Sequence, residues 1–331
     1  MSGLTRIGLW RWRLRFHNML FILEAVIWLF LIVGGAFFLE LFVVWKEGKA
    51  NAWKKAVAIV LSLGLAVVFY GSFIESKLLT VKENSISLYS FENSFTTSGK
   101  MRVALMSDLH MGWWKDAEWA KQVVERVNGE NPELVLIAGD FVLSKMKDAD
   151  ELGPLMDFNA PVYAVLGNHD HKFADANAVA AKLENLGITV LRNRHTRVKT
   201  KNGEFDLAGV DDVWFSADAD RALPIESPGV PVVLLAHNPD IILDSATMER
   251  SDLVLSAHTH GGHIRLPFIG PVPPLPTKLG RYYDEGLFEV GKKGLKLFIT
   301  TGVGESGVRA RLFNPPKIDM LDIIWKAQSA N

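Results

Sequence analysis

Four short apolar runs in this chain end in Asp, His or Asn, and this pattern constrains the fold more than any other feature. The runs cover residues 101–106, 133–138, 161–166 and 252–256. They lead into Ser-Asp-Leu-His, Gly-Asp, Gly-Asn-His-Asp and Ala-His-Thr-His-Gly-Gly-His, respectively. Short β-branched runs that stop at glycine or a polar residue are typical of buried strands. Since ligands collect at the carboxyl ends of strands in open α/β sheets, we expect a metal site there, with phosphate chemistry as the leading function.

Strand-like and helix-like segments alternate from about residue 100 to the end of the chain. Helical spacing predicts helices over residues 116–128, 175–186 and 240–248. The strand candidates are residues 103–106, 134–138, 162–166, 189–191, 205–208, 230–236, 253–256, 295–300 and 318–324. Only some of these strands are followed by helices. We therefore expect two facing sheets flanked by helices rather than one open parallel sheet.

Composition excludes several classes of function. A formal net charge of −1 over 331 residues argues against a general nucleic-acid-binding protein, so no nucleic-acid partner is expected. The absence of cysteine excludes disulfides, thiolate zinc sites and cysteine-nucleophile phosphatases. Residues 302–307 match the dinucleotide fingerprint literally, but Pro315 and Pro316 follow too soon for the βαβ unit that this motif requires. A tight glycine turn is expected there.

Two long apolar stretches precede these motifs and predict a transmembrane hairpin with helices over about 19–45 and 56–74. Residues 56–74 are uncharged and about as long as the roughly 20 residues that cross a hydrocarbon core. Residues 19–45 contain Glu24 and Glu40, so at least one glutamate is expected at the interface or facing the other helix. An intramembrane ion site is the alternative interpretation. The sequence thus divides into a membrane anchor, residues 1–80, and a main domain, residues 81–331.

The distribution of basic residues indicates the orientation of the hairpin. The leading arm contains four arginines and no acid, namely Arg6, Arg11, Arg13 and Arg15. The loop between the helices contains Lys46, Lys49, Lys54 and Lys55 against Glu47. The positive-inside rule slightly favours a cytoplasmic amino terminus, which returns the main domain to the cytoplasmic side.

The order of the polar motifs resembles the calcineurin-like metallophosphoesterase superfamily. Its pattern runs Asp-x-His, Gly-Asp, Gly-Asn-His-Asp/Glu, His, and then Gly-His-x-His. The five motifs occur in this order between Asp108 and His260 of this chain. His237 is the isolated histidine, and Ala257 replaces the usual glycine of the last motif. The resemblance covers the chain from about residue 100 to its end. It implies a four-layer α/β/β/α sandwich with two facing mixed sheets. The apolar segment and His-Thr-His-Gly-Gly look like the membrane-anchored bacterial branch, which implies an inner-membrane location.

The resemblance also implies the ligands of two divalent transition-metal ions. It assigns one ion to Asp108, His110, Asp140 and His260, and the other to Asp140, Asn168, His237 and His258, with Asp140 shared. Imidazole and carboxylate ligands suit Mn, Fe or Zn. A water between two such ions loses its proton near neutral pH and acts as the nucleophile. His169 has no metal in this assignment and is expected to protonate the leaving oxygen or stabilise the transition state.

The chain departs from the family pattern in two places that bear on the site. Many relatives have Gly-Asp-x-x-Asp, whose second Asp orients the catalytic histidine, but Leu143 stands at that position. Another group, with Asp170 as the candidate, must orient His169, or this histidine works with less support. His263 stands where this branch often has Gln, and either contacts substrate or lies on the surface.

Arg309 and Arg311 are the candidate phosphate-binding residues, because a guanidinium can bind a phosphate through two parallel hydrogen bonds. Solvated surface charge is the alternative for both. The sequence thus favours a dinuclear-metal hydrolase that cleaves a phosphodiester or pyrophosphate bond near a bilayer. By resemblance, a lipid-linked substrate such as UDP-diacylglucosamine is one candidate, and a generic phosphodiesterase or phosphomonoesterase is equally consistent. Two alternatives belong to other functional classes. One is a membrane-tethered scaffold without catalytic activity, and the other is a channel or transporter. The oligomeric state is left open by the sequence.

Overall fold

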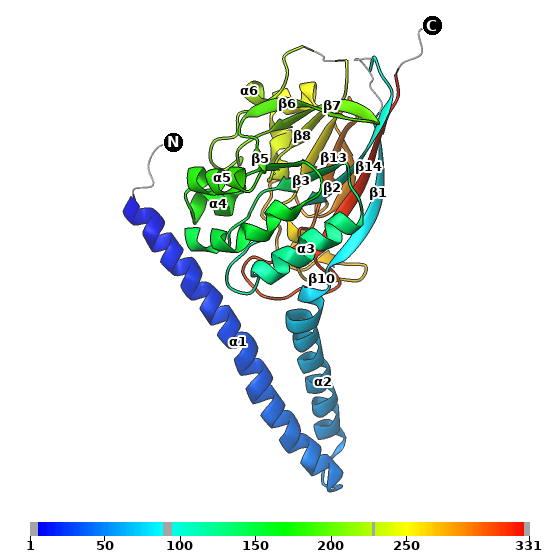
Figure 1. Cartoon of the computed structure of the whole chain (residues 1–331). Coiled ribbons are helices and arrows are strands. Elements are labelled where there is room, and N and C mark those ends of the chain that lie inside the picture. Colours follow the sequence, from blue (N-terminus) through cyan, green and yellow to red (C-terminus); the bar gives the residue numbers. More distant parts are fainter. Residues whose placement is uncertain (1–5, 89–94, 227–228, 328–331) are drawn as a thin grey trace.

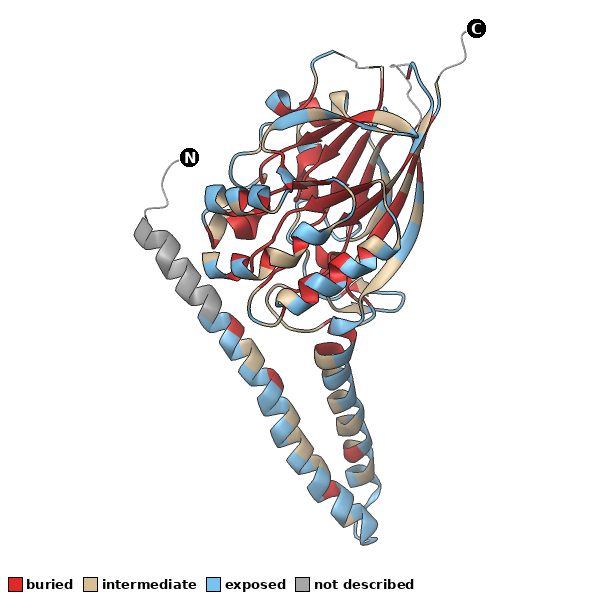
Figure 2. Cartoon of the chain, in the orientation of Figure 1, coloured by how far each residue is buried: buried red, intermediate tan, exposed pale blue. Residues whose placement is uncertain are grey.

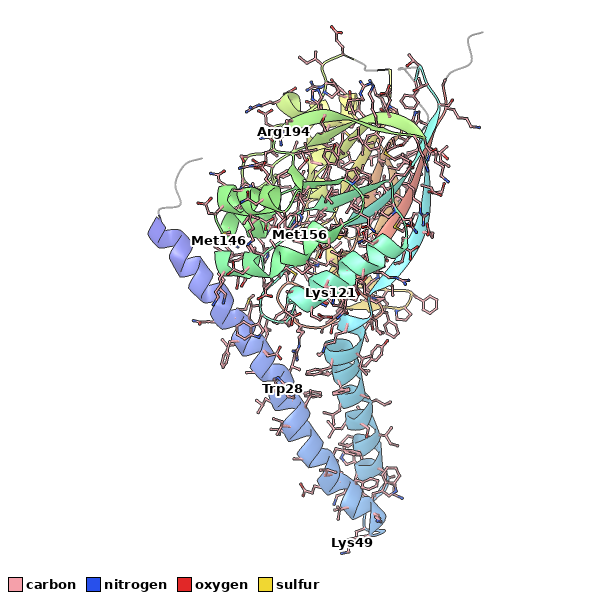
Figure 3. The ribbon with its side chains drawn as sticks, viewed as in Figure 1. Trp28, Lys49, Lys121, Met146, Met156 and Arg194 are labelled. Carbon is pink, nitrogen blue, oxygen red and sulfur yellow. The ribbon has the colours of Figure 1, made fainter. Side chains whose placement is uncertain are left out.

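The computed structural model describes residues 6–88, 95–226 and 229–327, with side chains from residue 18 onward. Two long helices project from a body of sheets and shorter helices (Figure 1). Helix α1 (Arg6–Lys46) and helix α2 (Ala52–Phe69) are joined by a turn that contains Lys49, at the end farthest from the body (Figures 1 and 3). The arginine side chains of the leading arm lie outside the described residues.

The two helices have the length and hydropathy to cross a membrane. The spans are Asn18–Lys46 and Ala52–Lys77, with mean hydropathies of 2.5 and 2.4. Only 11% and 17% of their most apolar windows are buried, and Figure 2 shows both helices largely exposed. A core helix of a soluble domain is instead mostly buried. These helices therefore favour membrane association of the chain.

The end of α2 is docked onto the body of the protein. Beyond Phe69 the helix continues as a π-helical turn, η1 (Tyr70–Ile74), and a 3-10 turn, η2 (Glu75–Lys77). The amide of Arg311 donates to the Gly71 carbonyl (3.0 Å), and the buried Lys115 Nζ donates to the Ser76 carbonyl (2.7 Å). The amide of Asn314 donates to the Glu75 carboxylate (2.6 Å). The helix therefore enters the body at a defined orientation.

The body is built on two mixed six-stranded sheets. The first has the order β1 (Thr80–Leu88), β14 (Lys317–Trp325), β2 (Gly99–Met106), β3 (Leu134–Ala138), β4 (Val162–Val165), β5 (Thr189–Val190). The second has the order β12 (Gly286–Val290), β13 (Leu295–Ile299), β9 (Leu253–Ser256), β8 (Val232–Leu235), β7 (Gly203–Gly209), β6 (Arg194–Thr200). A third, two-stranded ribbon pairs β10 (Arg265–Leu266) with β11 (Gly270–Pro271).

Successive side chains of the central strands point to opposite faces of each sheet, and they form three apolar cores. In β2, Val103 and Leu105 face the second sheet, whereas Ala104 and Met106 face the helices. The first helical layer contains α3 (Ala117–Gly129), η3 (Met146–Asp157) and α5 (Ala176–Asn185). The second contains α6 (Ala219–Ala222), η4 (Pro239–Leu243) and α7 (Ser245–Arg250). Successive strand side chains point to opposite faces, so each sheet is covered on both sides. The predicted four-layer fold class is confirmed.

Strand direction determines which end of the sheets carries the polar loops. β1 begins directly after η2, and its first residue, Thr80, pairs with Lys317 of β14. β14 is antiparallel to β2 and pairs Asp319 with Leu105, near the carboxyl end of β2. β3 and β4 run parallel to β2. The loops after β2, β3 and β4 therefore lie at the end of the sheet where α2 enters (Figure 1).

One predicted helix is wrong as a single element. Residues 240–248 form most of η4 and most of α7, which are separated at Asp244. The Asp244 backbone is extended, and its side chain accepts from the Thr247 amide, so it caps a new helix. The other two predicted helices are present as α3 and α5, where Asp116 and Asp175 serve as N-caps. Strands β1, β6, β10, β11 and β12 were not among the sequence candidates.

Candidate metal centre

The structure brings the seven predicted metal ligands together from five loops. Asp108 and His110 follow β2, and Asp140 follows β3. Asn168 begins the short helix α4 (Asn168–Lys172), which follows β4. His237 follows β8, while His258 and His260 follow β9. All seven are buried, at 0–7% exposure, which separates them from ordinary solvated surface charge.

The backbone at this site is strained. In the described part of the chain, ten non-glycine residues have positive φ, and six of them lie here: Asp108, His110, Asp140, His258, His260 and His263. Such conformations are unfavourable for residues with a Cβ, and they cluster at functional sites. Gly167 has an extended φ and is needed for a different reason, since a Cβ there would lie 2.1 Å from Asp140 Oδ1. The strained turns direct the side chains inward.

One half of the centre contains Asp108, His110 and His260. The Nε2 atoms of His110 and His260 are 3.3 Å apart. Asp108 Oδ1 lies 3.3 Å from His260 Nε2 and 3.7 Å from His110 Nε2. This oxygen is buried and has no hydrogen-bond donor among the described residues. Asp140 Oδ2 completes the group at 3.5 Å from His110 Nε2.

The other half is arranged around His237. Its Nε2 lies 3.3 Å from Asp140 Oδ2, 3.1 Å from Asn168 Oδ1 and 3.0 Å from His258 Nδ1. The same Asp140 oxygen therefore faces both halves. Asp140 therefore lies between the two groups of side chains, within 3.5 Å of a histidine nitrogen in each.

Hydrogen bonds on the outer sides determine which histidine nitrogens face the centre. His237 Nδ1 donates to the Ala138 carbonyl (2.7 Å), and His258 Nε2 donates to the Pro276 carbonyl (2.9 Å). In the neutral form, the remaining nitrogens, His237 Nε2 and His258 Nδ1, then point lone pairs at each other (3.0 Å), and His237 Nε2 also faces Asp140 Oδ2 (3.3 Å). Such an arrangement of acceptors is stabilised by a positive charge between them. The donor set of imidazole nitrogens and carboxylate or amide oxygens fits Mn, Fe or Zn.

The pKa values of these groups indicate the same need for positive charge. Burial alone lowers the pKa of His237, but the Asp140 carboxylate outweighs this effect and raises that pKa to about 10. Burial raises the pKa of Asp140, but His237, His169 and His110 outweigh it and hold that pKa well below its usual range. Burial raises the pKa of Asp108 to about 6. The site therefore favours an ionised Asp140 beside a cationic partner.

His169 lies beside the two halves and is oriented by the main chain. Its Nδ1 donates to the Leu143 carbonyl (2.7 Å), and its Nε2 lies 3.2 Å from Ser306 Oγ. The His169 amide donates to Asp140 Oδ1 (2.8 Å), which ties the histidine to the shared carboxylate. The ring makes an edge contact with the ring of His110, with centroids 4.5 Å apart.

Asp170 does not orient His169, contrary to the candidate role that the sequence suggested. Its carboxylate instead accepts from the amides of Asp140 (3.0 Å) and Gly167 (2.9 Å). It also accepts from the amides of Phe141 (3.0 Å) and Val142 (3.2 Å). Asp170 therefore holds the two ligand-bearing loops against each other.

The predicted substrate-binding residues have different placements. Arg311 is fully buried, and its guanidinium donates to Glu305 and to the carbonyls of Thr301, Gly302, Gly304 and Asn314. This placement excludes the expected phosphate contact, because every guanidinium nitrogen already binds protein. Arg309 Nη2 lies 2.9 Å from Glu24 Oε1 of α1, and the guanidinium stacks 4.4 Å from the Phe73 ring centre. The His263 ring contacts the His260 ring at 4.3 Å.

Sequence reasoning missed three residues at the centre. Ser306 faces His169, as described above. Asp212 is buried, and it influences the pKa of His237. Trp214 places its ring edge-on to His258 with centroids 4.8 Å apart, and it is 49% exposed. Asp211 and Asp212 follow a strand that ends at Gly209, so the strand-end pattern was a usable signal for Asp212. Ser306 and Trp214 had no such signal.

A family model described as calcineurin-like phosphoesterase matches residues 101–262, which include all the ligands discussed above. Phosphodiesterase YaeI of Escherichia coli (strain K12) is 32% identical over 234 residues, covering 67% of this chain and 82% of that protein. An uncharacterized metallophosphoesterase of Helicobacter pylori is 28% identical over 295 residues, covering 86% and 74%. A zebrafish (Danio rerio) protein named "Transmembrane protein with metallophosphoesterase domain" is 30% identical over 234 residues. That match covers 66% of this chain and 52% of the relative.

Proposed function

Because this chain belongs to the calcineurin-like phosphoesterase family and is a metal-dependent phosphoesterase, we propose which of its residues bind metal and which transfer protons. Asp108, His110 and His260 would hold one divalent cation, and Asn168, His237 and His258 a second. Asp140 would be shared between the two. The observation that supports this division is the single oxygen Asp140 Oδ2, 3.5 Å from His110 Nε2 and 3.3 Å from His237 Nε2.

Bound cations of this kind supply Lewis acidity toward phosphoryl oxygens and an activated water. The protein's own contribution is position and proton transfer. The Nδ1 proton of His169 is held by the Leu143 carbonyl, so any proton exchanged with substrate moves at Nε2. We assign His169 the protonation of the leaving oxygen, with Ser306 holding the ring through Nε2 until substrate binds. Asp170 keeps the Asp140 turn in place, which preserves the spacing of the two halves.

Basic side chains next to the centre would bind the rest of the substrate. Arg311 is fully engaged within the fold, as described above. A cavity of about 350 Å³ follows the His110 and Leu143 loops, and its lining includes Trp113, Lys145 and Lys147 together with Asp148, Asp150 and Glu151. The cavity as a whole therefore has no excess of positive charge, and Lys145 and Lys147 would contact phosphoryl oxygens individually, with Trp113 as an aromatic face. His263 and Arg309 are kept as further substrate candidates.

The position of the centre relative to the helices supports a proposal for the substrate class. The polar loops are at the end of the sheet where α2 enters, so a bilayer crossed by the two helices would lie near the site. From Glu24 to Lys46, α1 rises roughly 33 Å at 1.5 Å per residue. This length suits a hydrocarbon core of about 30 Å. We therefore propose a membrane anchor with its boundary near residue 80 and an amphipathic, lipid-linked phosphodiester or pyrophosphate substrate. UDP-diacylglucosamine is one such compound.

A generic phosphodiesterase without lipid specificity is the second candidate. The similarity to phosphodiesterase YaeI of Escherichia coli favours it. The basic residues around the hairpin favour a cytoplasmic main domain at a bacterial inner membrane for either candidate.

Hydrolysis by the full-length protein in nanodiscs tests the proposal. With manganese present, the protein should cleave a chromogenic bis-phosphodiester, and metal analysis should find about two ions per chain. Asp140→Ala and His169→Ala should abolish cleavage, while His195→Ala, on the edge strand β6, and Glu125→Ala, on the outer face of α3, should retain it. Full activity in either site variant would refute the assigned roles. Faster cleavage of lipid-linked pyrophosphates than of soluble diesters would favour the lipid-linked class, and equal rates would favour the generic one.

A further inference from the structure

An uncharged segment of the chain forms a short hairpin with an exposed apolar tip. Residues 266–277 contain no charged side chain. Within them, β10 and β11 pair with Leu266 opposite Gly270, which leaves Pro267, Phe268 and Ile269 at the tip. Phe268 is fully exposed and has a φ of +66°. Ile269 and Val272 are 62% and 51% exposed. We call residues 264–277 the interfacial hairpin.

The interfacial hairpin lies directly beside the exit of α2. The Arg265 amide donates to the Leu312 carbonyl (2.9 Å), and the neighbouring Arg311 amide donates to the Gly71 carbonyl (3.0 Å). Gly71 belongs to the membrane-span candidate Ala52–Lys77. Figure 1 shows β10 at the point where α2 joins the body. Phe313, the residue after Leu312, is also 60% exposed, so the apolar surface continues toward the helix.

The base of the hairpin is held firmly by polar contacts. Arg265 forms an ion pair with Asp284 (2.7 Å) and donates to the Gly261 carbonyl (3.1 Å). Arg281 donates to the Pro271 carbonyl. These contacts keep Phe268 and Ile269 outside the body. Contiguous exposed apolar side chains on a stable base indicate an interaction surface, since they lower solubility without adding to the core.

The residues that follow the hairpin have the composition of a membrane–water interface. Lys278, Arg281, Tyr282 and Tyr283 come directly after the uncharged segment, and Tyr282 is 76% exposed. Tyrosine is enriched at the headgroup level, and Lys and Arg are attracted to anionic lipids. This composition fits a lipid surface better than the face of a second protein chain.

We propose that the interfacial hairpin inserts Phe268 and Ile269 into the same bilayer that α1 and α2 cross. The proposal rests on the membrane association in the proposed function. The chain then contacts lipid at two places, through the helices of the anchor and through the hairpin of the main domain. The hairpin also bears on the metal centre, because the Pro276 carbonyl accepts from Nε2 of His258 at 2.9 Å. Lipid contact and the orientation of a proposed ligand are therefore built into one segment.

Single-cysteine labelling tests the insertion directly, because the chain contains no cysteine of its own. Phe268→Cys, Phe30→Cys and Ile225→Cys would each receive an environment-sensitive fluorophore. Phe30 lies in α1 between Glu24 and Lys46, and Ile225 is 87% exposed ahead of β8, at the opposite end of the strands from the metal centre. Full-length proteins would be placed in phosphatidylcholine–phosphatidylglycerol nanodiscs, with and without brominated acyl chains.

The label at position 268 should lose most of its emission to brominated lipid, as the label at position 30 does, while the label at position 225 keeps its emission. Emission at position 268 that is unchanged by bromination would overturn the proposal. So would a label that is shielded from aqueous iodide but not quenched by brominated lipid, because a second copy of the chain would then cover the tip. Quenching needs no turnover, so the measurement is repeated with Asp140→Ala. Failed hydrolysis by the unmodified protein with intact quenching counts against the proposed reaction alone.

Discussion

The Nδ1 nitrogen of His169 lies 2.7 Å from the main-chain carbonyl oxygen of Leu143. A carbonyl can only accept, so this contact places the Nδ1 proton on the outer side of the ring and turns Nε2 toward the centre. Leu143 stands at the position of the second Asp in the Gly-Asp-x-x-Asp pattern with which the sequence was compared. The main chain therefore orients His169, and the side chain of Leu143 is not needed for this contact and is buried instead.

The first prediction follows from that contact. Leu143→Met, which nearly conserves volume, should keep activity close to that of the unmodified protein, because the carbonyl stays in place. His169→Gln should lower kcat by about 10²–10⁴, the usual contribution of a general acid or base. Steady-state rates on a soluble diester provide the measurement. A large loss in Leu143→Met with unchanged thermal stability would show that the side chain itself acts on the histidine.

Asp170→Asn should lower both the stability of the protein and its metal affinity, although Asp170 is not proposed to contact substrate. The carboxylate accepts four amide hydrogen bonds, and an asparagine turns an N–H₂ group toward some of the same donors. We expect a loss of about 2 kcal/mol or more in the free energy of unfolding, the cost of leaving buried amides unpaired. Metal affinity should fall with it, because the Asp140 turn is released. Thermal melts and metal titrations of the variant check both effects, and an unchanged metal affinity would contradict this role.

Acid should destabilise the protein partly through Asp211. Burial raises the pKa of this carboxyl, but His171 and Arg192 outweigh it and lower the pKa to about 2. A carboxyl whose pKa is lowered by folding stabilises the protein above its unfolded pKa of about 4. That contribution, about 1–2 kcal/mol, is lost as the pH falls toward 2. Asp211→Asn should therefore be less stable than the unmodified protein at pH 6 and show a shallower loss between pH 5 and pH 2. Denaturant unfolding at each pH measures this, and Glu125→Gln should keep the original slope.

The ion pair between Glu24 and Arg309 should couple α1 to the main domain. Glu24 also accepts from Trp28 Nε1 (3.1 Å), and Trp28 packs against Phe73 with ring centres 5.2 Å apart. Trp28 lies on the part of α1 nearer the body than the turn at Lys49 (Figure 3). Removing either charge leaves its partner poorly solvated, so Glu24→Gln and Arg309→Gln should each lower the melting temperature. Their double-mutant coupling should be about 1–3 kcal/mol.

A charge exchange separates this pairing from a role of Arg309 in substrate binding. The combined variant Glu24→Arg with Arg309→Glu should recover much of the lost stability, since the pair is restored with its signs reversed. Loss of activity in that stable variant would instead support phosphate binding by Arg309. Melting temperature and kcat/KM, measured on the same preparation, distinguish the two roles.

Most of the fold, and the gathering of polar residues at the strand ends, could be predicted because both depend on local patterns. Apolar runs of strand length that stop at Asp, Asn or His require only the neighbouring residues to be recognised. Asp108, Asp140 and His258 all belong to such runs, and parallel strands bring their ends to one edge of a sheet. The helix over residues 240–248 was predicted wrongly because the capping propensity of Asp244 competed with a helical apolar pattern and prevailed.

Roles that depend on distant contacts could not be predicted in this way. Arg311 was expected at a phosphate because a guanidinium can bind one through two parallel hydrogen bonds, but folding encloses it with Glu305 and four carbonyls. Ser306 reaches His169 from 137 positions away in the chain. The acceptor for His169 is a backbone oxygen, and every residue has one, so no side-chain pattern could indicate it.

The sequence by itself determined the layered α/β architecture, the apolar helix pair and the list of polar residues at the strand ends, because each follows from periodicity or from neighbouring residues. Tertiary structure alone decided that Asp140 faces both halves of the centre, that Arg309 pairs with Glu24 and that the interfacial hairpin lies beside α2. These relationships join segments that are far apart in the chain. Their geometry is set by strand order and direction, which residue-by-residue patterns do not specify.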